Sequence, residues 1–122
     1  GLMIGLRRHN LSIPVLGVCV CDDAATFQPI VATIAQQAHA RWPSLPRFEH
    51  DDVHIVEGYV GRGYALSTPE ELADIATVAQ RTGMLLDPVY TGKAFRALLM
   101  EPSLFGHTPL FIHTGGLFGL LA

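Results

Sequence analysis

Residues 86–93 read Leu86-Asp87-Pro88-Val89-Tyr90-Thr91-Gly92-Lys93. A short apolar run precedes this motif at residues 84–86, and a helix-like pattern follows it at residues 94–100. Since the residue before a proline avoids the helical region, the motif predicts a turn between a buried strand and a helix. Such turns face the ligand crevice of open α/β sheets, because strand carboxyl ends and helix amino ends share one edge. A plain turn with Thr91 as the helix N-cap explains the same residues without a ligand.

Apolar runs and helix-like patterns alternate along the rest of the chain. Residues 15–21 form a continuous apolar run, which is typical of a central parallel strand buried on both faces. The other predicted strands cover residues 53–57, 84–86 and 110–113. Their alternation with helices predicts an α/β fold, in which helices flank a parallel sheet, and a single domain over residues 1–122.

Helices are predicted over residues 2–10, about 27–38, 68–82 and 94–100, with a last one after the Thr114-Gly115-Gly116 turn. The helix after residue 68 has the clearest start. Thr68 can cap it, Pro69 takes its first position and Glu71 completes a capping box. Gly83 is expected to end it.

Pro29 leaves two interpretations of the helix around residues 27–38. Either the helix begins near Gln28, with the proline in its first turn, or it kinks at Pro29.

The composition excludes some classes of partner. The chain has 122 residues, of which 49% are hydrophobic, and a net charge of −3. It therefore lacks the strong positive charge of proteins that bind nucleic acid or anionic membranes. No apolar run approaches the roughly 18 residues of a membrane span, and no signal peptide is evident. We expect Cys19 and Cys21 to be buried, reduced thiols, and we predict a cytoplasmic protein with no nucleic-acid or membrane partner.

Several residues suggest chemistry but lack the partners that it requires. His50 and His54 flank two aspartates, yet no third zinc ligand is evident, so we predict no metal site. Residues 58–64 are rich in glycine, but their spacing matches no phosphate-binding motif, and an irregular active-site loop is favoured. The single lysine, Lys93, is either a Schiff-base former or a helix-start residue, and we favour the second.

Two motifs, at residues 87–94 and 110–116, closely resemble the C-terminal third of the D-cysteine desulfhydrase and 1-aminocyclopropane-1-carboxylate deaminase family. The loop at residues 57–64, and its spacing to Tyr90, are similar as well. Members of this family are pyridoxal-phosphate enzymes with the fold of the tryptophan synthase β subunit. The resemblance thus implies the C-terminal part of the large domain of that fold.

The resemblance also implies residue roles. Tyr64 and Tyr90 match two catalytic tyrosines that face substrate and cofactor. Thr114 matches the residue that hydrogen-bonds the pyridine nitrogen, Thr91 lines the same pocket, and Gly115 lies in the cofactor-binding turn. The deaminase branch usually has glutamate and leucine at the two threonine positions, so this chain resembles the desulfhydrase branch. The implied reaction is β-elimination of D-cysteine to pyruvate, ammonia and sulfide, with a 1-aminocyclopropane-1-carboxylate deaminase-like activity as an alternative.

The chain departs from the family in one respect. The Schiff-base lysine and the phosphate cradle of the family match no residue here, because Lys93 corresponds to a different family lysine. The apolar ends of the chain also predict a fragment. We therefore expect no turnover by the chain alone. It would act on a small amino-acid substrate with an N-terminal complementing segment or as a homo-oligomer. The alternative is a non-catalytic α/β module that self-associates or binds a partner.

Overall fold

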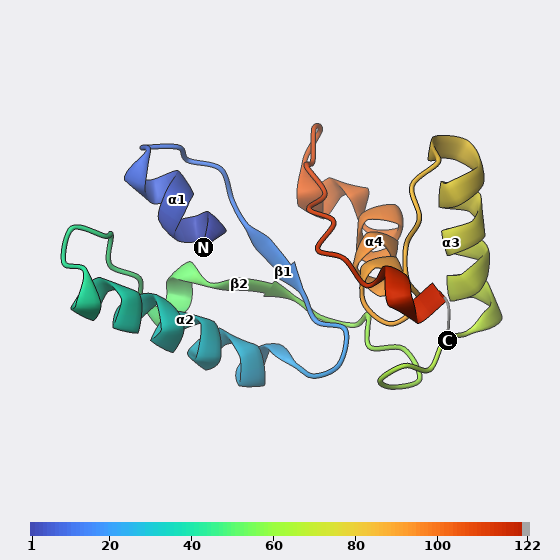
Figure 1. Ribbon diagram of the computed structural model, residues 1–122, viewed down its shortest axis with the longest axis horizontal. Coiled ribbons are helices and arrows are strands. Elements are labelled where there is room, and N and C mark those ends of the chain that lie inside the picture. The colour runs from blue at the N-terminus through green and yellow to red at the C-terminus, as the bar shows by residue number, and fades with distance from the viewer. Residues whose placement is uncertain (121–122) are drawn as a thin grey trace. The chain divides into compact units, whose positions relative to one another are not determined.

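The computed structural model describes residues 1–120, which fall into two compact units (Figure 1). Unit 1 comprises Gly1–Gly17 and Asp22–Val56, and unit 2 comprises Val18–Cys21 and the residues from Glu57 onward. The single domain over residues 1–122 stays a prediction.

Unit 1 is a small α/β arrangement. Its elements are α1 (Leu2–Arg8), β1 (Leu16–Val18), α2 (Ala24–Arg41), the 3₁₀ helix η1 (His50–Asp52) and β2 (His54–Val56). The last residue of β1, Val18, is assigned to unit 2. The strands β1 and β2 pair as a two-stranded parallel sheet, and α2 connects them. Parallel strands need such a crossover, since a hairpin cannot join them. The buried apolar residues include Ala32 and Ala35 on α2, with Phe48 and Val53. The α/β prediction is confirmed.

The helix α2 begins at Ala24, before Pro29. Asp23 is its N-cap, and the carboxylate accepts a hydrogen bond from the backbone N–H of Thr26 at 2.8 Å. This cap supports an extra turn from Ala24, so the prediction of a start near Gln28 is wrong. Pro29 therefore lies inside the helix, where it cannot donate to the carbonyl of Ala25.

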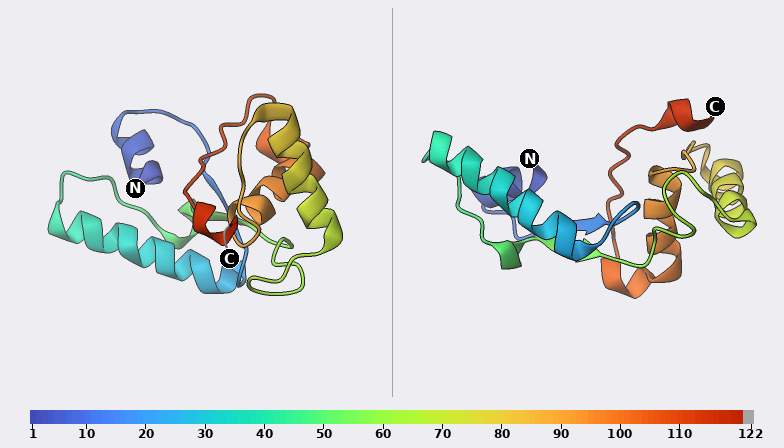
Figure 2. Two further views of the ribbon diagram at one scale, coloured as in Figure 1. Left: turned by 45° about the vertical axis from the view of Figure 1, so that its right-hand side comes forward. Right: turned by 90° about the horizontal axis from the view of Figure 1, so that it is seen from below.

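Unit 2 is built on two packed helices. They are α3 (Pro69–Thr82) and α4 (Thr91–Met100), which lie side by side in both views of Figure 2. The short 3₁₀ helices η2 (Pro102–Phe105) and η3 (Leu117–Leu120) follow. The core includes Val78 of α3, Ala97 of α4, and Leu86 from the segment between these helices.

The predicted start and end of α3 are confirmed. Thr68 accepts a hydrogen bond from the Glu71 backbone N–H at 3.3 Å, and the Glu71 carboxylate accepts one from the Thr68 N–H at 2.7 Å. This is the reciprocal capping box. Gly83 ends the helix with φ at +75°, a conformation that glycine adopts without a steric penalty.

Two predicted strands are wrong. Residues 84–86 and 110–113 belong to no sheet in the described part of the chain, although the His113 ring lies 2.8 Å from the Leu85 carbonyl oxygen. An apolar run becomes a strand only where a second backbone supplies ladder hydrogen bonds, and sequence pattern alone does not reveal that partner. Consistent with this, Leu110 is 84% exposed.

Smaller differences concern the cysteines and the last helix. Cys19 is buried and Cys21 is exposed, so the expectation of two buried thiols holds only for Cys19. Both cysteines lie beyond the end of β1 at Val18, and burial decreases from Cys19 through the half-buried Val20 to Cys21. The predicted last helix appears as the 3₁₀ turn η3, and residues 121–122 lie outside the described part.

Across residues 1–120, none of the helices combines the length and the apolar character needed to cross a membrane.

Candidate functional site

The turn at residues 87–91 is organised by a buried carboxylate. Asp87 is 0% exposed, and its Oδ1 accepts hydrogen bonds from the backbone N–H groups of Val89 at 2.8 Å and Tyr90 at 2.7 Å. Its Oδ2 accepts from the Thr91 N–H at 2.8 Å and from the Thr91 hydroxyl at 2.5 Å. Burial alone would raise the pKa of Asp87, but these four bonds outweigh it and hold that pKa below its ordinary value.

Asp87 also replaces the helix cap that the sequence suggested. The helix α4 begins at Thr91, Tyr90 is its N-cap residue, and Tyr90 makes no side-chain cap bond. The N–H of Thr91, the first residue of α4, donates to the Asp87 carboxylate, and the Gly92 N–H donates to the Asp87 carbonyl oxygen at 2.8 Å. The carboxylate also complements the positive end of the helix dipole. The prediction of Thr91 as the N-cap is therefore wrong, because a residue four positions earlier supplies the acceptor.

The two sequence motifs meet at this carboxylate. A side chain at Gly116 would collide with the Asp87 carboxylate, and Gly116 has φ at +90°. Only glycine satisfies both conditions. A local hydrogen bond shapes the turn before Gly116, in which the Gly115 N–H donates to His113 Nδ1 at 3.2 Å. The C-terminal ends of the two predicted strands therefore lie together, as a shared ligand edge requires, although no sheet joins them.

The predicted catalytic tyrosines form a pair. The hydroxyl groups of Tyr64 and Tyr90 are hydrogen-bonded to each other. The rings lie edge to face, with centroids 5.9 Å apart, and the residues are 58% and 43% exposed. The hydrogen bond with Tyr64 raises the pKa of Tyr90 above its ordinary value, so Tyr90 keeps its proton at neutral pH. The pair is accessible to a ligand.

The segment that carries Tyr64, residues 58–66, is called the glycine loop below. It is irregular, as predicted, and is attached to α4 at three places. Tyr59 donates to the Glu101 carboxylate at 2.5 Å, beside the C-terminal end of α4. Lys93 Nζ donates to two loop carbonyls, those of Val60 at 2.6 Å and Gly63 at 2.7 Å. The third attachment is the tyrosine pair.

The residues predicted to bind the cofactor lie in different environments. Thr91 is 3% exposed, and its hydroxyl also accepts a hydrogen bond from the Asp87 N–H at 2.8 Å. That hydroxyl is fully engaged with Asp87. Thr114 is exposed, while Gly115 is partly buried with φ at +113°. Tyr64 and Tyr90 are brought together, and Tyr90 and Thr91 share the Asp87 carboxylate.

The sequence analysis missed the capping role of Asp87 and the burial of Lys93. Asp87 was interpreted only as the end of a strand, and its position four residues before the first residue of α4 was the available signal for a capping role. Lys93 is the third residue of α4, as a helix-start residue would be, but it is 1% exposed. Its partners lie 30 and 33 residues earlier, so no local pattern indicates its burial.

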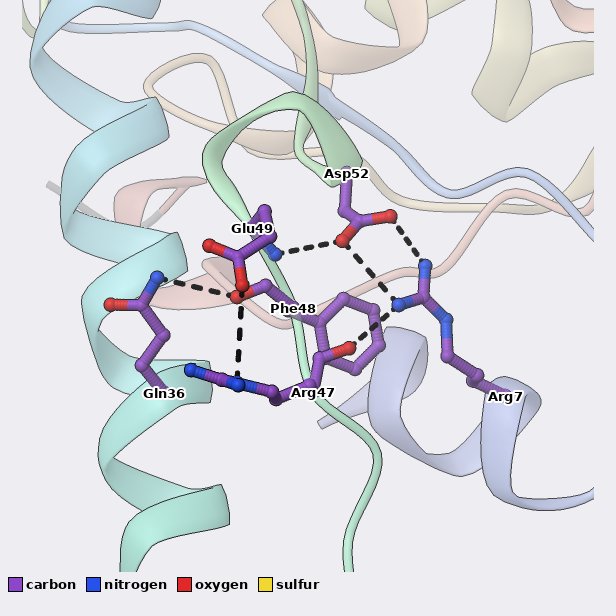
Figure 3. Close-up of polar contacts among 6 residues, drawn as sticks. All are labelled: Arg7, Gln36, Arg47, Phe48, Glu49 and Asp52. Atoms are coloured by element: carbon purple, nitrogen blue, oxygen red, sulfur yellow. Dashed lines mark hydrogen bonds and ion pairs between the residues drawn. The ribbon is translucent and has the colours of Figure 1, made fainter.

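Unit 1 contains a separate groove of about 520 Å³. It is lined by α1, by residues 10–15 and by Phe48, Asp52 and His54. Figure 3 shows the polar contacts beside it. The Arg7 guanidinium donates to the Asp52 carboxylate at 2.6 Å and to the Arg47 carbonyl at 2.7 Å, and it stacks over the Phe48 ring at 4.0 Å.

These contacts leave the groove without a charged group directed at a ligand. Asp52 is also bonded to the Glu49 N–H at 2.7 Å, so both charges at the groove are already satisfied. Within residues 1–120, no three histidine, cysteine or acidic side chains gather as a metal ion would require. Unit 2 is therefore the better candidate for chemistry.

Comparison with known proteins gives consistent relatives. No protein-family model matches the chain. It is 38% identical to a bifunctional D-cysteine desulfhydrase/1-aminocyclopropane-1-carboxylate deaminase, described as mitochondrial, of Arabidopsis thaliana, over 98% of this chain and 30% of that protein. It is 34% identical to a putative 1-aminocyclopropane-1-carboxylate deaminase of Thermotoga maritima and 36% identical to a D-cysteine desulfhydrase of Klebsiella pneumoniae. Both matches cover 100% of this chain and 38% of the relative. The chain thus spans about a third of the length of these relatives.

Proposed function

Because the chain is homologous along its whole length to part of the D-cysteine desulfhydrase and 1-aminocyclopropane-1-carboxylate deaminase family, we propose that it forms one side of the active site of a pyridoxal-phosphate-dependent lyase. The proposed reaction is the elimination of sulfide from D-cysteine, which gives pyruvate and ammonia. The observation that carries this proposal is the exposed pair of Tyr64 and Tyr90. Their hydroxyls meet beside the turn that the sequence singled out.

The tyrosine pair suits a reaction that moves protons near a small amino acid. Tyr90 keeps its proton, and its hydroxyl is hydrogen-bonded to that of Tyr64. A phenol in this state can donate to a carboxylate or to a leaving thiolate. We propose that the pair orients the substrate and supplies a proton, while the Asp87 turn holds Tyr90 in place.

Residues 1–120 fit only part of the cofactor. Thr114 offers an exposed hydroxyl for the ring nitrogen, but Thr91 is engaged with Asp87. The one lysine amine is buried and bound to carbonyls, so it is not available to hold the aldehyde. When bound, pyridoxal phosphate supplies an electron sink for the amino-acid carbanion. We propose that a complementing segment provides the amine and the phosphate cradle.

The relatives are named for different substrates, so their names alone do not select one for this chain. The Arabidopsis relative is named for both activities, the Thermotoga relative for deamination of 1-aminocyclopropane-1-carboxylate, and the Klebsiella relative for D-cysteine. Threonine at positions 91 and 114 resembles the desulfhydrase branch, so D-cysteine is the preferred substrate in this proposal. A cytoplasmic location stays a prediction.

A chimaeric enzyme tests the proposal. This chain would replace the matching segment of the Klebsiella relative, and pyruvate formed from D-cysteine would be measured with pyridoxal phosphate present. We expect activity, and we expect Tyr90→Phe to lower kcat by about 100-fold, because the loss of a proton donor typically costs that much. The control variant Ser103→Ala removes an exposed hydroxyl from η2 and should leave kcat unchanged.

A chimaera that folds and binds the cofactor but forms no pyruvate would contradict the proposal. Equal kcat for the Tyr90→Phe variant and the parent chimaera would show that Tyr90 supplies no proton in the reaction.

Exposed apolar side chains favour a second candidate, a non-catalytic module that self-associates. Many large apolar side chains of the described residues are exposed, up to 84% for Leu110 and 88% for Phe118, and extended exposed apolar surface marks interaction sites. Sedimentation equilibrium separates the two proposals. A tight homo-oligomer that also fails the chimaera test would favour the module, whereas a monomer that gains activity in the chimaera would exclude it.

A further inference from the structure

We propose that Lys93 is a positioning residue, whose buried ammonium group holds the glycine loop on α4 and thereby sets the Tyr64 hydroxyl against that of Tyr90. The inference rests on the proposed function only in taking this tyrosine pair as part of the site. It is distinct from cofactor anchoring, since it assigns the lysine a role in which the amine never reaches a ligand.

The burial of Lys93 is the first step. The residue is 1% exposed, although a buried ammonium is costly unless it is hydrogen-bonded. Two bonds to carbonyl oxygens, at 2.6 and 2.7 Å, compensate for the lost hydration. A lysine that only began a helix would extend its amine into water, as lysine side chains usually do.

The second step is that the glycine loop has weak support of its own. Its internal backbone bonds are long, with Gly63 N to Val60 O at 3.4 Å and Leu66 N to Gly63 O at 3.2 Å. Four of its residues have positive φ, and one of them is Ala65, which is not a glycine. A loop with this backbone needs outside contacts to keep one conformation. The carbonyls of Val60 and Gly63 accept these contacts from Lys93.

The third step connects the lysine to the tyrosines. Tyr64 directly follows Gly63, whose carbonyl is held by Lys93. Tyr90 is the N-cap residue of α4, three positions before Lys93. One end of the tyrosine pair therefore belongs to the held loop and the other to the holding helix. The lysine bonds fix the distance between them.

The test measures the tyrosine pair directly in the full chain. Tyrosine labelled with ¹³C at Cζ resolves the titration of each of the three phenols by NMR. Tyr64→Phe defines the effect of losing the pair, which is a lower Tyr90 pKa. Lys93→Met keeps the aliphatic stem and removes both carbonyl bonds. We expect it to lower the Tyr90 pKa by at least half as much as Tyr64→Phe. The double variant should show no further decrease.

The control variant is Arg81→Met, which removes an exposed cation from the last turn of α3 and should leave the Tyr90 pKa unchanged. An unaltered Tyr90 pKa in a folded Lys93→Met variant would overturn the proposal.

A second measurement does not depend on the folding of any variant. Arg62 is exposed and lies between the two carbonyls that Lys93 holds. We expect trypsin to cut after Arg62 at least about tenfold more slowly in the unmodified chain than in a free peptide of residues 57–67, because cleavage requires the loop to open. Equal rates would overturn the proposal. Neither readout uses activity, so a failed chimaera leaves the result intact.

Discussion

Arg7 in unit 1 and Lys93 in unit 2 are both cations that donate to backbone carbonyls distant in the sequence, yet their surroundings differ. The Arg7 side chain is 44% exposed and has a carboxylate partner, Asp52. Lys93 is 1% exposed, and its amine donates to the backbone carbonyls of Val60 and Gly63. Water screens an exposed ion pair, whereas a buried charge depends entirely on the groups that face it. The same type of contact should therefore matter little in unit 1 and much in unit 2.

The chain offers one optical probe for each unit. The single tryptophan, Trp42, belongs to unit 1, and the three tyrosines belong to unit 2. Tryptophan fluorescence and tyrosine near-ultraviolet signals can therefore follow the units separately during urea unfolding.

The largest effect is expected at the buried carboxylate of unit 2. Asp87→Asn replaces an acceptor of four hydrogen bonds by an amide whose N–H₂ group faces N–H donors. We expect the free energy of unfolding, read from the tyrosine signal, to fall by about 3 kcal/mol, the usual cost of unpairing buried donors around a lost charge. The exposed control Asp51→Asn lies in unit 1, and it should change the free energy of unfolding read from Trp42 fluorescence by less than about 0.5 kcal/mol. Similar losses for both variants would break the contrast between buried and exposed charges.

The next effect concerns packing at the start of α4. A Cβ atom at Gly92 would lie 2.6 Å from Ile75 Cδ1 and 2.7 Å from the Asp87 carbonyl oxygen. We expect Gly92→Ala to lower the free energy of unfolding of unit 2 by about 2 kcal/mol, because overpacking moves backbone as well as side chains. Gly5 lies inside α1, and a Cβ there would meet no atom within 4 Å apart from its chain neighbours and the backbone of its own helix, so Gly5→Ala should stabilise unit 1 by about 0.5 kcal/mol. A destabilised Gly5→Ala variant would show that α1, like α4, has no room for a side chain at its glycine.

These sites also show what the sequence could predict. The capping box of Thr68 and the end of α3 at Gly83 were predicted correctly, because every interacting group lies within a few residues. Tyr64 and Tyr90 were assigned to one site only through a family resemblance, because they lie 26 positions apart and no local pattern connects them. Residues 110–113 were wrongly predicted as a strand, because ladder bonds depend on a distant backbone. The burial of Lys93 was missed for the same reason.

Acid should affect unit 2 through Asp87. Its pKa in the folded state lies below the ordinary value of 3.8, so the folded state binds fewer protons than the unfolded state near that pH. The stabilising contribution is therefore fully present above the unfolded pKa and is lost as pH falls through the folded one. We expect the urea midpoint of the tyrosine signal to be constant near about pH 6 and to fall below about pH 4. In Asp87→Asn this fall should be smaller, and an unchanged fall would assign the acid sensitivity to other carboxylates.

The smallest effect is expected at the exposed ion pair of unit 1. Replacing Arg7 by methionine removes the bonds to Asp52 and to the Arg47 carbonyl, although the aliphatic stem remains over Phe48. The loss in free energy of unfolding, read from Trp42 fluorescence, should be about 1 kcal/mol or less, as for other exposed ion pairs. A double-mutant cycle with Asp52→Asn isolates the pair itself, and its coupling energy should shrink in 1 M salt. If the coupling energy instead equals the loss in Asp87→Asn and resists salt, the Arg7 contact behaves as a buried one. Exposure would then not explain how these two units differ.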